Sequence, residues 1–217
     1  MSLILTAICK DDICVCADTR YVDRKWDKGF KDGFDKIYKF DIYPLIIFNH
    51  GGNQFCGKYW DSYCQEYEKL GSWKGKDLES ISKDFKKFIE PLVAQQLLCN
   101  INAVPNNNYF KNSGFVLCGN NSQSGNYEVY EFYWDPKLKP DRWSGIQLIG
   151  TGIGYERYLK DDIDSLVKLN NFNHIQIKNE LERLFSIAKE RKKAVERKNP
   201  NSGKEFSDDP ITKSVIE

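Results

Sequence analysis

The fold is decided by two stretches near the start of the chain, Ser2-Leu-Ile-Leu-Thr-Ala-Ile-Cys9 and Ile13-Cys-Val-Cys-Ala-Asp18-Thr-Arg20, which flank the charged turn Lys10-Asp-Asp12. Each stretch holds a short apolar run, and two such runs on either side of a tight polar turn are typical of a β-hairpin. We therefore expect strands at 3–9 and 13–17, so that the first residues already belong to a sheet.

The rest of the chain predicts an α+β fold. Further strands are expected at 36–40, 44–49, 114–119, 127–134, 145–149 and 211–216. Apolar residues at helical spacing predict helices at 53–70, 77–98, 155–169 and 175–197, with Pro91 kinking or dividing the second. Residues 19–34 are charged and aromatic, which favours a long surface loop. This order fits a four-layer αββα sandwich, two stacked antiparallel sheets flanked by helices.

Composition predicts one compact domain spanning residues 1–217, since 41% of the residues are hydrophobic. The 32 Lys and Arg against 31 Asp and Glu give a net charge of +1, which predicts neither a nucleic-acid nor a membrane partner. The chain shows no signal peptide and no apolar run near the roughly 18 residues of a membrane helix, so a cytoplasmic location is expected. Only two histidines and no C-x-x-C pair are present, so no metal and no cofactor are expected.

The opening stretch resembles the start of proteasome β-type subunits, of the bacterial HslV-type protease and of the ancestral β-subunit group. In that family an aspartate follows the first residue of the mature chain after sixteen positions, and counting from Ser2 reaches Asp18. Four later segments continue the resemblance in order, Asp35-Lys36-Ile37, Gly51-Gly52, Gly150-Thr151-Gly152 and Asn199-Pro-Asn-Ser202-Gly203. The resemblance implies an N-terminal-nucleophile (Ntn) hydrolase fold over essentially the whole chain.

The resemblance also implies a set of site residues. Ser2 would be the nucleophile after removal of Met1, with its own free α-amine as the base. Lys36 would polarise the hydroxyl, Asp18 would hold Lys36, and the Gly51 N–H would face the oxyanion. The remaining implied residues are Thr151, Asn199 and Ser202, which would orient the amine and a water, and Tyr21, Phe34, Asn49 and Asn53, which would surround the substrate's first pocket.

Two departures bear on activity. Ser2 stands where proteasomes carry threonine, and Asn199 stands where they carry aspartate, so that a charge is lost and weaker catalysis is expected. The main hypothesis is a serine-type peptidase or amidase that acts on a peptide or amide substrate within a homo-oligomer. The alternatives are a catalytically inactive structural or binding subunit and a small-molecule amidase. The sequence indicates nothing about an ATP-driven unfoldase partner.

Each of these residues also has an explanation that involves no function. A serine after the initial methionine is common, Lys36 taken alone reads as a surface lysine, and Gly51-Gly52 reads as a turn. The glycines at 150–154 lack the lysine and the wider spacing of a phosphate-binding loop. The basic run 189–198 contains acidic residues and is typical of a solvated helix face.

Overall fold

The computed structural model describes residues 2–9, 11–23, 29–51, 54–101, 114–133, 141–144, 148–151, 153–163, 172–199 and 206–215. The chain divides into two compact units. The terminal unit contains Met1–Ile37 and Gly145–Glu217, and the central unit contains Tyr38–Ser144. Each unit has its own sheet and its own hydrophobic core.

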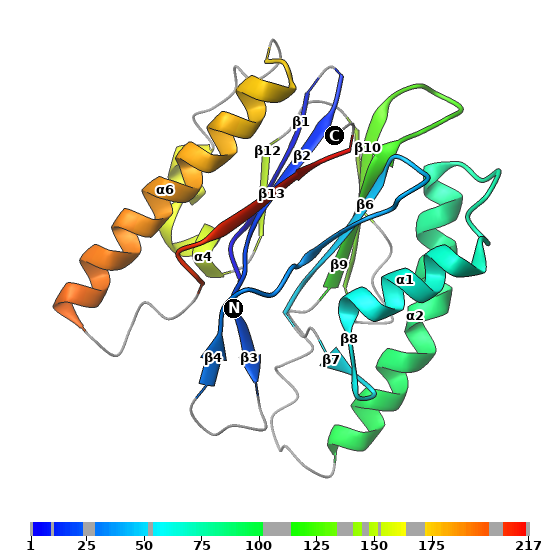
Figure 1. Cartoon of the computed structure of the whole chain (residues 1–217), viewed down its shortest axis with the longest axis horizontal. Coiled ribbons are helices and arrows are strands. Elements are labelled where there is room, and N and C mark those ends of the chain that lie inside the picture. The colour runs from blue at the N-terminus through cyan, green and yellow to red at the C-terminus, as the bar shows by residue number, and fades with distance from the viewer. Residues whose placement is uncertain are drawn as a thin grey trace. The chain divides into compact units, whose positions relative to one another are not determined.

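The terminal unit is built on a four-stranded antiparallel sheet in the order β12-β1-β2-β13. Its strands are β1 (Ile4–Ile8), β2 (Ile13–Asp18), β12 (Leu148–Thr151) and β13 (Pro210–Ser214). Its helices are α4 (Ile153–Tyr158), α5 (Lys160–Ile163) and α6 (His174–Lys198). The long helix α6 lies along one face of this sheet (Figure 1).

Burial explains why the two opening stretches are almost continuously apolar. Every residue of β1 and β2 is buried, and a strand buried on both faces needs apolar side chains on both. One face of the pair packs against α6, where Leu3 and Leu5 share a core with Leu181 and Phe185. The helix begins at a capping box in which Asn173 and Gln176 bond reciprocally, so its start is fixed locally.

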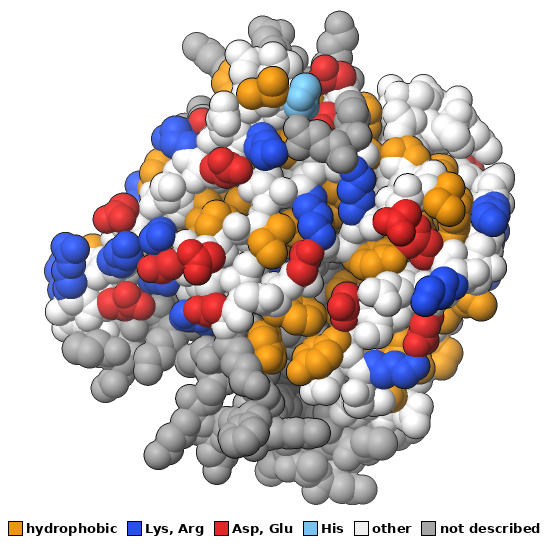
Figure 2. Space-filling view, viewed as in Figure 1, with side chains coloured by type: hydrophobic (Ala, Val, Ile, Leu, Met, Phe, Trp, Pro, Cys, Tyr) orange, Lys and Arg blue, Asp and Glu red, His pale blue; other side chains and the backbone are white. Residues whose placement is uncertain are grey.

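Most side chains of the basic run 189–198 are exposed or half-buried on α6, with Lys192 as the buried exception. Figure 2 shows the Lys and Arg side chains over α6 interspersed with Asp and Glu. Arg183 pairs with Glu180 at 2.6 Å, and Arg191 pairs with Asp162 of α5. This mixture of charges matches a solvated helix face that offers no patch of a single sign.

The central unit is built on a five-stranded sheet in the order β11-β10-β9-β6-β5. Its strands are β5 (Ile37–Lys39), β6 (Leu45–His50), β9 (Gly114–Asn120), β10 (Tyr127–Tyr133) and β11 (Asp141–Ser144). The helices α1 (Trp60–Leu70) and α2 (Leu78–Ile101) lie against one face of it (Figure 1). A cluster of buried rings that includes Trp60, Tyr67, Phe85 and Phe115 fills the space between helices and sheet.

These elements confirm the predicted α+β class, with two antiparallel sheets flanked by helices. Pro91 lies inside α2 and does not divide it, contrary to one expectation. The strand β11 was not predicted; it lies between the strands expected at 127–134 and 145–149. The helix expected at 155–169 is replaced, within the described residues, by the two short helices α4 and α5.

Two further predictions were wrong, the loop at 19–34 and the start of the helix at 53. The expected loop at 19–34 contains a two-stranded ribbon, β3 (Tyr21–Asp23) paired with β4 (Gly29–Lys31). The helix expected from 53 begins at Trp60, because the preceding residues form the short pair β7 (Gln54–Phe55) and β8 (Lys58–Tyr59). The turn between them has positive φ at Cys56 and Gly57, 46° and 82°, which a helix cannot contain.

No helix within the described ranges is both long and apolar enough to cross a membrane. The assignment of the whole chain to a single domain stays a prediction.

Candidate functional site

Ser2, Lys36 and Asp18 meet inside the terminal unit. The Lys36 ammonium donates to the Ser2 hydroxyl oxygen at 3.1 Å and to an Asp18 carboxylate oxygen at 2.7 Å. All three residues are buried, with exposed fractions of 3%, 4% and 1% in the order Ser2, Lys36, Asp18. A buried lysine therefore bridges a hydroxyl and a carboxylate that lie at opposite ends of the β1–β2 hairpin sequence.

The Asp18 carboxylate is held by the backbone as well as by Lys36. One oxygen accepts the Leu3 N–H at 2.9 Å, and the other accepts the Arg20 N–H at 3.0 Å and the Ser207 N–H at 3.3 Å. Because a carboxylate is an acceptor only, these donors fix its orientation and compensate its burial. The Leu3 contact also ties Asp18 to the residue that follows Ser2.

Ser207 joins this network and was not among the predicted site residues. Its hydroxyl accepts the Thr19 N–H at 2.8 Å and lies 3.0 Å from the Thr19 hydroxyl. It is fully buried, and its N–H reaches Asp18 across 189 positions of sequence. No spacing rule indicates such a contact, since a single serine before a strand is an ordinary residue.

Burial lowers the pKa of Lys36 below its usual value near 10.5, and the neighbouring Asp18 carboxylate opposes that shift. The desolvation effect is the larger of the two, because the amine has little contact with water. A lysine with a lowered pKa gives up its proton more easily than a lysine in water, and in its neutral form it can accept a proton. The arrangement can thus move a proton between the Ser2 hydroxyl and Lys36.

The ribbon β3–β4 is closed at its base beside this network. The Arg20 guanidinium makes two bonds to the Asp32 carboxylate, at 2.7 and 2.8 Å, and the Phe34 N–H donates to the Thr19 carbonyl at 3.0 Å. The rings of Tyr21 and Phe34, both predicted pocket residues, lie with centroids 5.5 Å apart. Both side chains are half-buried, so the structure brings these two predicted residues together.

Thr151 and Gly154 approach the other side of the Ser2 segment. Thr151 pairs with Ile4 in the ladder between β12 and β1, and the Gly154 N–H donates to the Ser2 carbonyl at 3.1 Å. A Cβ on Gly154 would come within 2.8 Å of the Leu3 Cβ and 2.9 Å of the Phe206 ring. Only glycine therefore permits this approach of backbone to backbone.

The other predicted site residues lie in the central unit, at the end of α6 or outside the described residues. Gly51, with φ of +88°, and the buried Asn49 belong to the central unit, and their roles stay predictions. Asn199 is exposed and ends α6, with its N–H donating to the Val195 carbonyl at 2.9 Å. Asn53 and Ser202 lie outside the described residues.

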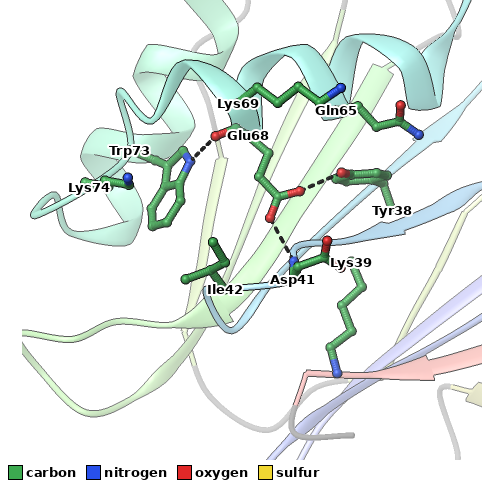
Figure 3. Close-up of a pocket in the computed structure, with 9 residues that line it drawn as sticks. All are labelled: Tyr38, Lys39, Asp41, Ile42, Gln65, Glu68, Lys69, Trp73 and Lys74. Atoms are coloured by element: carbon green, nitrogen blue, oxygen red, sulfur yellow. Dashed lines mark hydrogen bonds between the residues drawn. The ribbon is translucent and has the colours of Figure 1, made fainter.

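A separate cavity of about 540 Å³ lies in the central unit, between α1 and the turn that precedes β6 (Figure 3). Glu68 accepts the Tyr38 hydroxyl at 2.6 Å and the Asp41 N–H at 2.8 Å, and its carbonyl accepts the Trp73 indole N–H at 3.0 Å. These groups satisfy one another and tie the turn to the helix. Burial and the adjacent Glu68 carboxylate raise the pKa of Tyr38, which makes it an unsuitable base.

Within the described ranges, no group of three or more His, Cys, Asp or Glu side chains is placed to hold a metal ion. The candidate site is the Ser2–Lys36–Asp18 network with Ser207, on the strength of its buried hydrogen bonds.

Comparisons with known proteins support the fold. No family model matches the chain, and no curated protein matches it in sequence. Among solved structures, the Anbu complex of Pseudomonas aeruginosa, described as a helical assembly, aligns with a TM-score of 0.66 at 13% identity, over 98% of this chain and 80% of that one. Anbu (ancestral beta-subunit) from Yersinia bercovieri aligns with a TM-score of 0.64 at 9% identity, over 98% and 81%.

A third solved structure is similar over less of the chain. It is the Anbu (Gly-1) mutant from Hyphomicrobium sp. strain MC1, with a TM-score of 0.56 at 10% identity, covering 88% of this chain and 75% of that one. Identities this low show the fold alone, which is the proteasome-like Ntn fold. They also correct one prediction. The resemblance was given to the proteasome β-type, the HslV-like and the ancestral β-subunit proteins as one family. The assignment to the proteasome β-type and HslV-like family is wrong, because the similar structures are Anbu (ancestral beta-subunit) proteins, a distinct though related family.

Proposed function

We propose that this chain is an Ntn hydrolase that cleaves amide bonds through an acyl-enzyme on Ser2. The observation that carries the proposal is the buried Lys36, whose ammonium lies 3.1 Å from the Ser2 oxygen and 2.7 Å from Asp18. A serine hydroxyl needs an adjacent base to act as a nucleophile, and a lysine with a lowered pKa is such a base.

The first half-reaction forms an ester on Ser2. The Ser2 oxygen attacks the carbonyl carbon of the substrate amide while its proton passes to the neutral amine of Lys36. The tetrahedral intermediate then collapses, the C–N bond breaks, and the leaving amine takes the proton from Lys36. In the second half-reaction water attacks the ester, and the acid product and the free Ser2 hydroxyl are released.

The α-amine of Ser2 becomes available only when the bond between Met1 and Ser2 has been cut. A free α-amine has a pKa of about 7.7 to 8.0, so it can relay the same proton at neutral pH. Asp18 acts through Lys36, because it receives the ammonium at one oxygen and is itself fixed by three backbone donors. The proposal assigns no role to Asn199, which ends α6 at the surface.

Peptides are the proposed substrate class, and a homo-oligomer is the proposed state. The solved Pseudomonas aeruginosa Anbu complex is a helical assembly, and this chain shares its fold. In such an assembly, only substrates that can enter it would reach Ser2. A small-molecule amidase would use the same reaction on a smaller amide substrate.

A catalytically inactive structural subunit is the second candidate. The observation in its favour is that Ser2 is only 3% exposed, so a substrate has little access to the hydroxyl in this conformation. The enzyme proposal requires that an extended peptide reach Ser2, whereas the structural role requires no access.

Turnover of fluorogenic peptides by the purified protein distinguishes the two candidates. The hydrolase is supported if turnover disappears in both Ser2→Ala and Lys36→Ala while the fold is kept. Lys83→Met is the control, because it removes an exposed lysine on α2 that pairs with Glu79 one turn earlier, at 2.8 Å. Turnover that persists unchanged in Ser2→Ala would exclude the proposed mechanism.

A further inference from the structure

Lys36 lies in a segment without regular structure, residues 32–36, directly before β5. A lysine side chain has four rotatable bonds, so its ammonium is well placed only if the backbone beneath it is fixed. The start of this segment is held by the Arg20–Asp32 pair and by the bond from the Phe34 N–H to the Thr19 carbonyl. The two residues next to Lys36 are held by contacts from β13, which belongs to the same terminal unit.

The residue that makes these contacts is Lys213. Its ammonium pairs with the Asp35 carboxylate and donates to the Ile37 carbonyl at 2.7 Å. The other oxygen of Asp35 accepts the Ile37 N–H at 2.9 Å. Lys213 thus contacts both residues that flank Lys36, Asp35 and Ile37, and these two also bond to each other.

The strand that carries Lys213 is in register with the strand that carries Asp18. In the ladder between β13 and β2, Pro210 pairs with Asp18 and Lys213 pairs with Val15. The β2–β13 pair therefore places Lys213 relative to Asp18, and Lys213 in turn places the backbone of Lys36. The positions of Lys36 and of Asp18 are therefore both set by the strands β2 and β13.

We propose that Lys213, through Asp35, is a positioning residue that sets Lys36 against Ser2. This inference rests on the proposed function, since it concerns the same nucleophile. Lys213 and Asp35 are partly exposed, with side-chain fractions of 30% and 45%, so their ion pair is screened by water and adds little to global stability. Its loss is expected to change the reactivity of Ser2 more than the stability of the fold.

The test measures acylation of Ser2 by a peptide epoxyketone or β-lactone, following the adduct by intact mass. Lys213→Met is expected to lower the maximal acylation rate about tenfold or more, because a misplaced catalytic group costs up to about 10²-fold in rate. The concentration of probe at half-maximal rate should stay within about twofold, since Lys213 is expected to position Lys36 and not to bind the probe.

Two further measurements distinguish a positioning role of Lys213 from a general structural effect. One is the acylation rate of the conservative variant Lys213→Arg, and the other is the rate of the double variant compared with the single ones. Lys213→Arg keeps a cation with several donors and is expected to retain acylation within about threefold. Asp35→Asn should resemble Lys213→Met, and the double variant should be no slower than the slower single variant, because the two residues act as one unit. Lys83→Met is the matched control, since it removes an exposed ion pair on α2.

An acylation rate in Lys213→Met equal to that of the wild type would overturn the inference while leaving the proposed function intact. If the wild-type protein is not acylated at all, the proposed function fails and hydrogen exchange decides the inference instead. Faster exchange of the Ile37 amide in Lys213→Met, but not in Lys83→Met, then supports the positioning role. Unchanged exchange of that amide would overturn it.

Discussion

At the scale of single residues, the identity of the group at position 36 decides the chemistry. Lys36→Arg keeps the positive charge beside Asp18 but cannot release a proton, because the arginine pKa exceeds 12. If Lys36 accepts the Ser2 proton, this variant should lose about 10²- to 10⁴-fold in acylation rate. The measurement is the rate of adduct formation by intact mass. Retention of the wild-type rate would show that Lys36 supplies only a fixed charge.

The pH dependence of acylation follows from the lowered pKa of Lys36. The neutral amine is the reactive form, so the rate should rise with pH and level off above the pKa of Lys36 in the folded protein. Because burial lowers that pKa from 10.5, the midpoint should lie below 10.5. The rate profile can be compared with the titration of the Lys36 ε-carbon signal by NMR. A rate that first rises at the usual lysine pKa would contradict the assignment.

Some site residues could be predicted from the sequence and others could not. Ser2, Asp18 and Lys36 were identified through the family resemblance, whose sixteen-residue spacing and Asp-Lys-Ile segment this sequence contains. Ser207 was not identifiable, because its contact with Asp18 joins segments 189 residues apart. Asn199 was named from the resemblance of 199–203 to a family segment, and in the structure its N–H donates to the Val195 carbonyl at the end of α6.

At the scale of elements, the segment that carries Ser207 is anchored to α6 by Lys192. The Lys192 ammonium donates to the Phe206 carbonyl at 2.8 Å and to Asp208 at 2.6 Å, and it lies 4.5 Å from the centre of the Phe206 ring. Lys192 is 2% exposed and Phe206 is fully buried. Together these contacts place Ser207 beside Asp18.

Lys192→Met is therefore expected to lower the free energy of unfolding by about 1–3 kcal/mol, because a buried carbonyl loses its donor. The adjacent Lys193 is the matched control. It makes only long contacts, 3.8 Å to Glu190 and 4.0 Å to Asp208, so Lys193→Met should cost about 0–1 kcal/mol. Urea unfolding measures both. Equal losses in the two variants would show that Lys192 is not an anchor.

The strands were easier to predict than the irregular segments. Strands β1 and β2 are buried on both faces, so their apolar runs are unmistakable. The β3–β4 ribbon was missed because its strands are only three residues long within a charged and aromatic segment, and because no local pattern indicates the Arg20–Asp32 pair at its base. The start of α1 was misplaced because Phe55 and Tyr59 continue the four-residue aromatic spacing across a turn that is not helical.

At the scale of the whole molecule, the fold is retained where the sequence is not. Identities of 13% and 9% accompany TM-scores of 0.66 and 0.64. Low sequence identity with a similar fold is expected when a core tolerates exchange of apolar residues of similar volume. The hydrophobic pattern and the burial of each position then persist while the residue identities change.

The proposed homo-oligomer predicts a mass well above that of one chain. The monomer mass is 25.3 kDa, so light scattering coupled to gel filtration should give a multiple of that value. The ratio of the measured mass to 25.3 kDa counts the subunits directly. A single species at 25.3 kDa over a wide range of concentrations would contradict the assembly.

The account depends most directly on Ser2 acting as a free N-terminal nucleophile. The decisive measurement is the intact mass of the purified protein before and after reaction with a peptide epoxyketone or β-lactone, with Ser2→Ala as the control. The account predicts a chain that lacks Met1 and gains one adduct located on Ser2, with no adduct in the control. A chain that retains Met1 and gains no adduct would contradict the hydrolase and favour a structural subunit with the same fold.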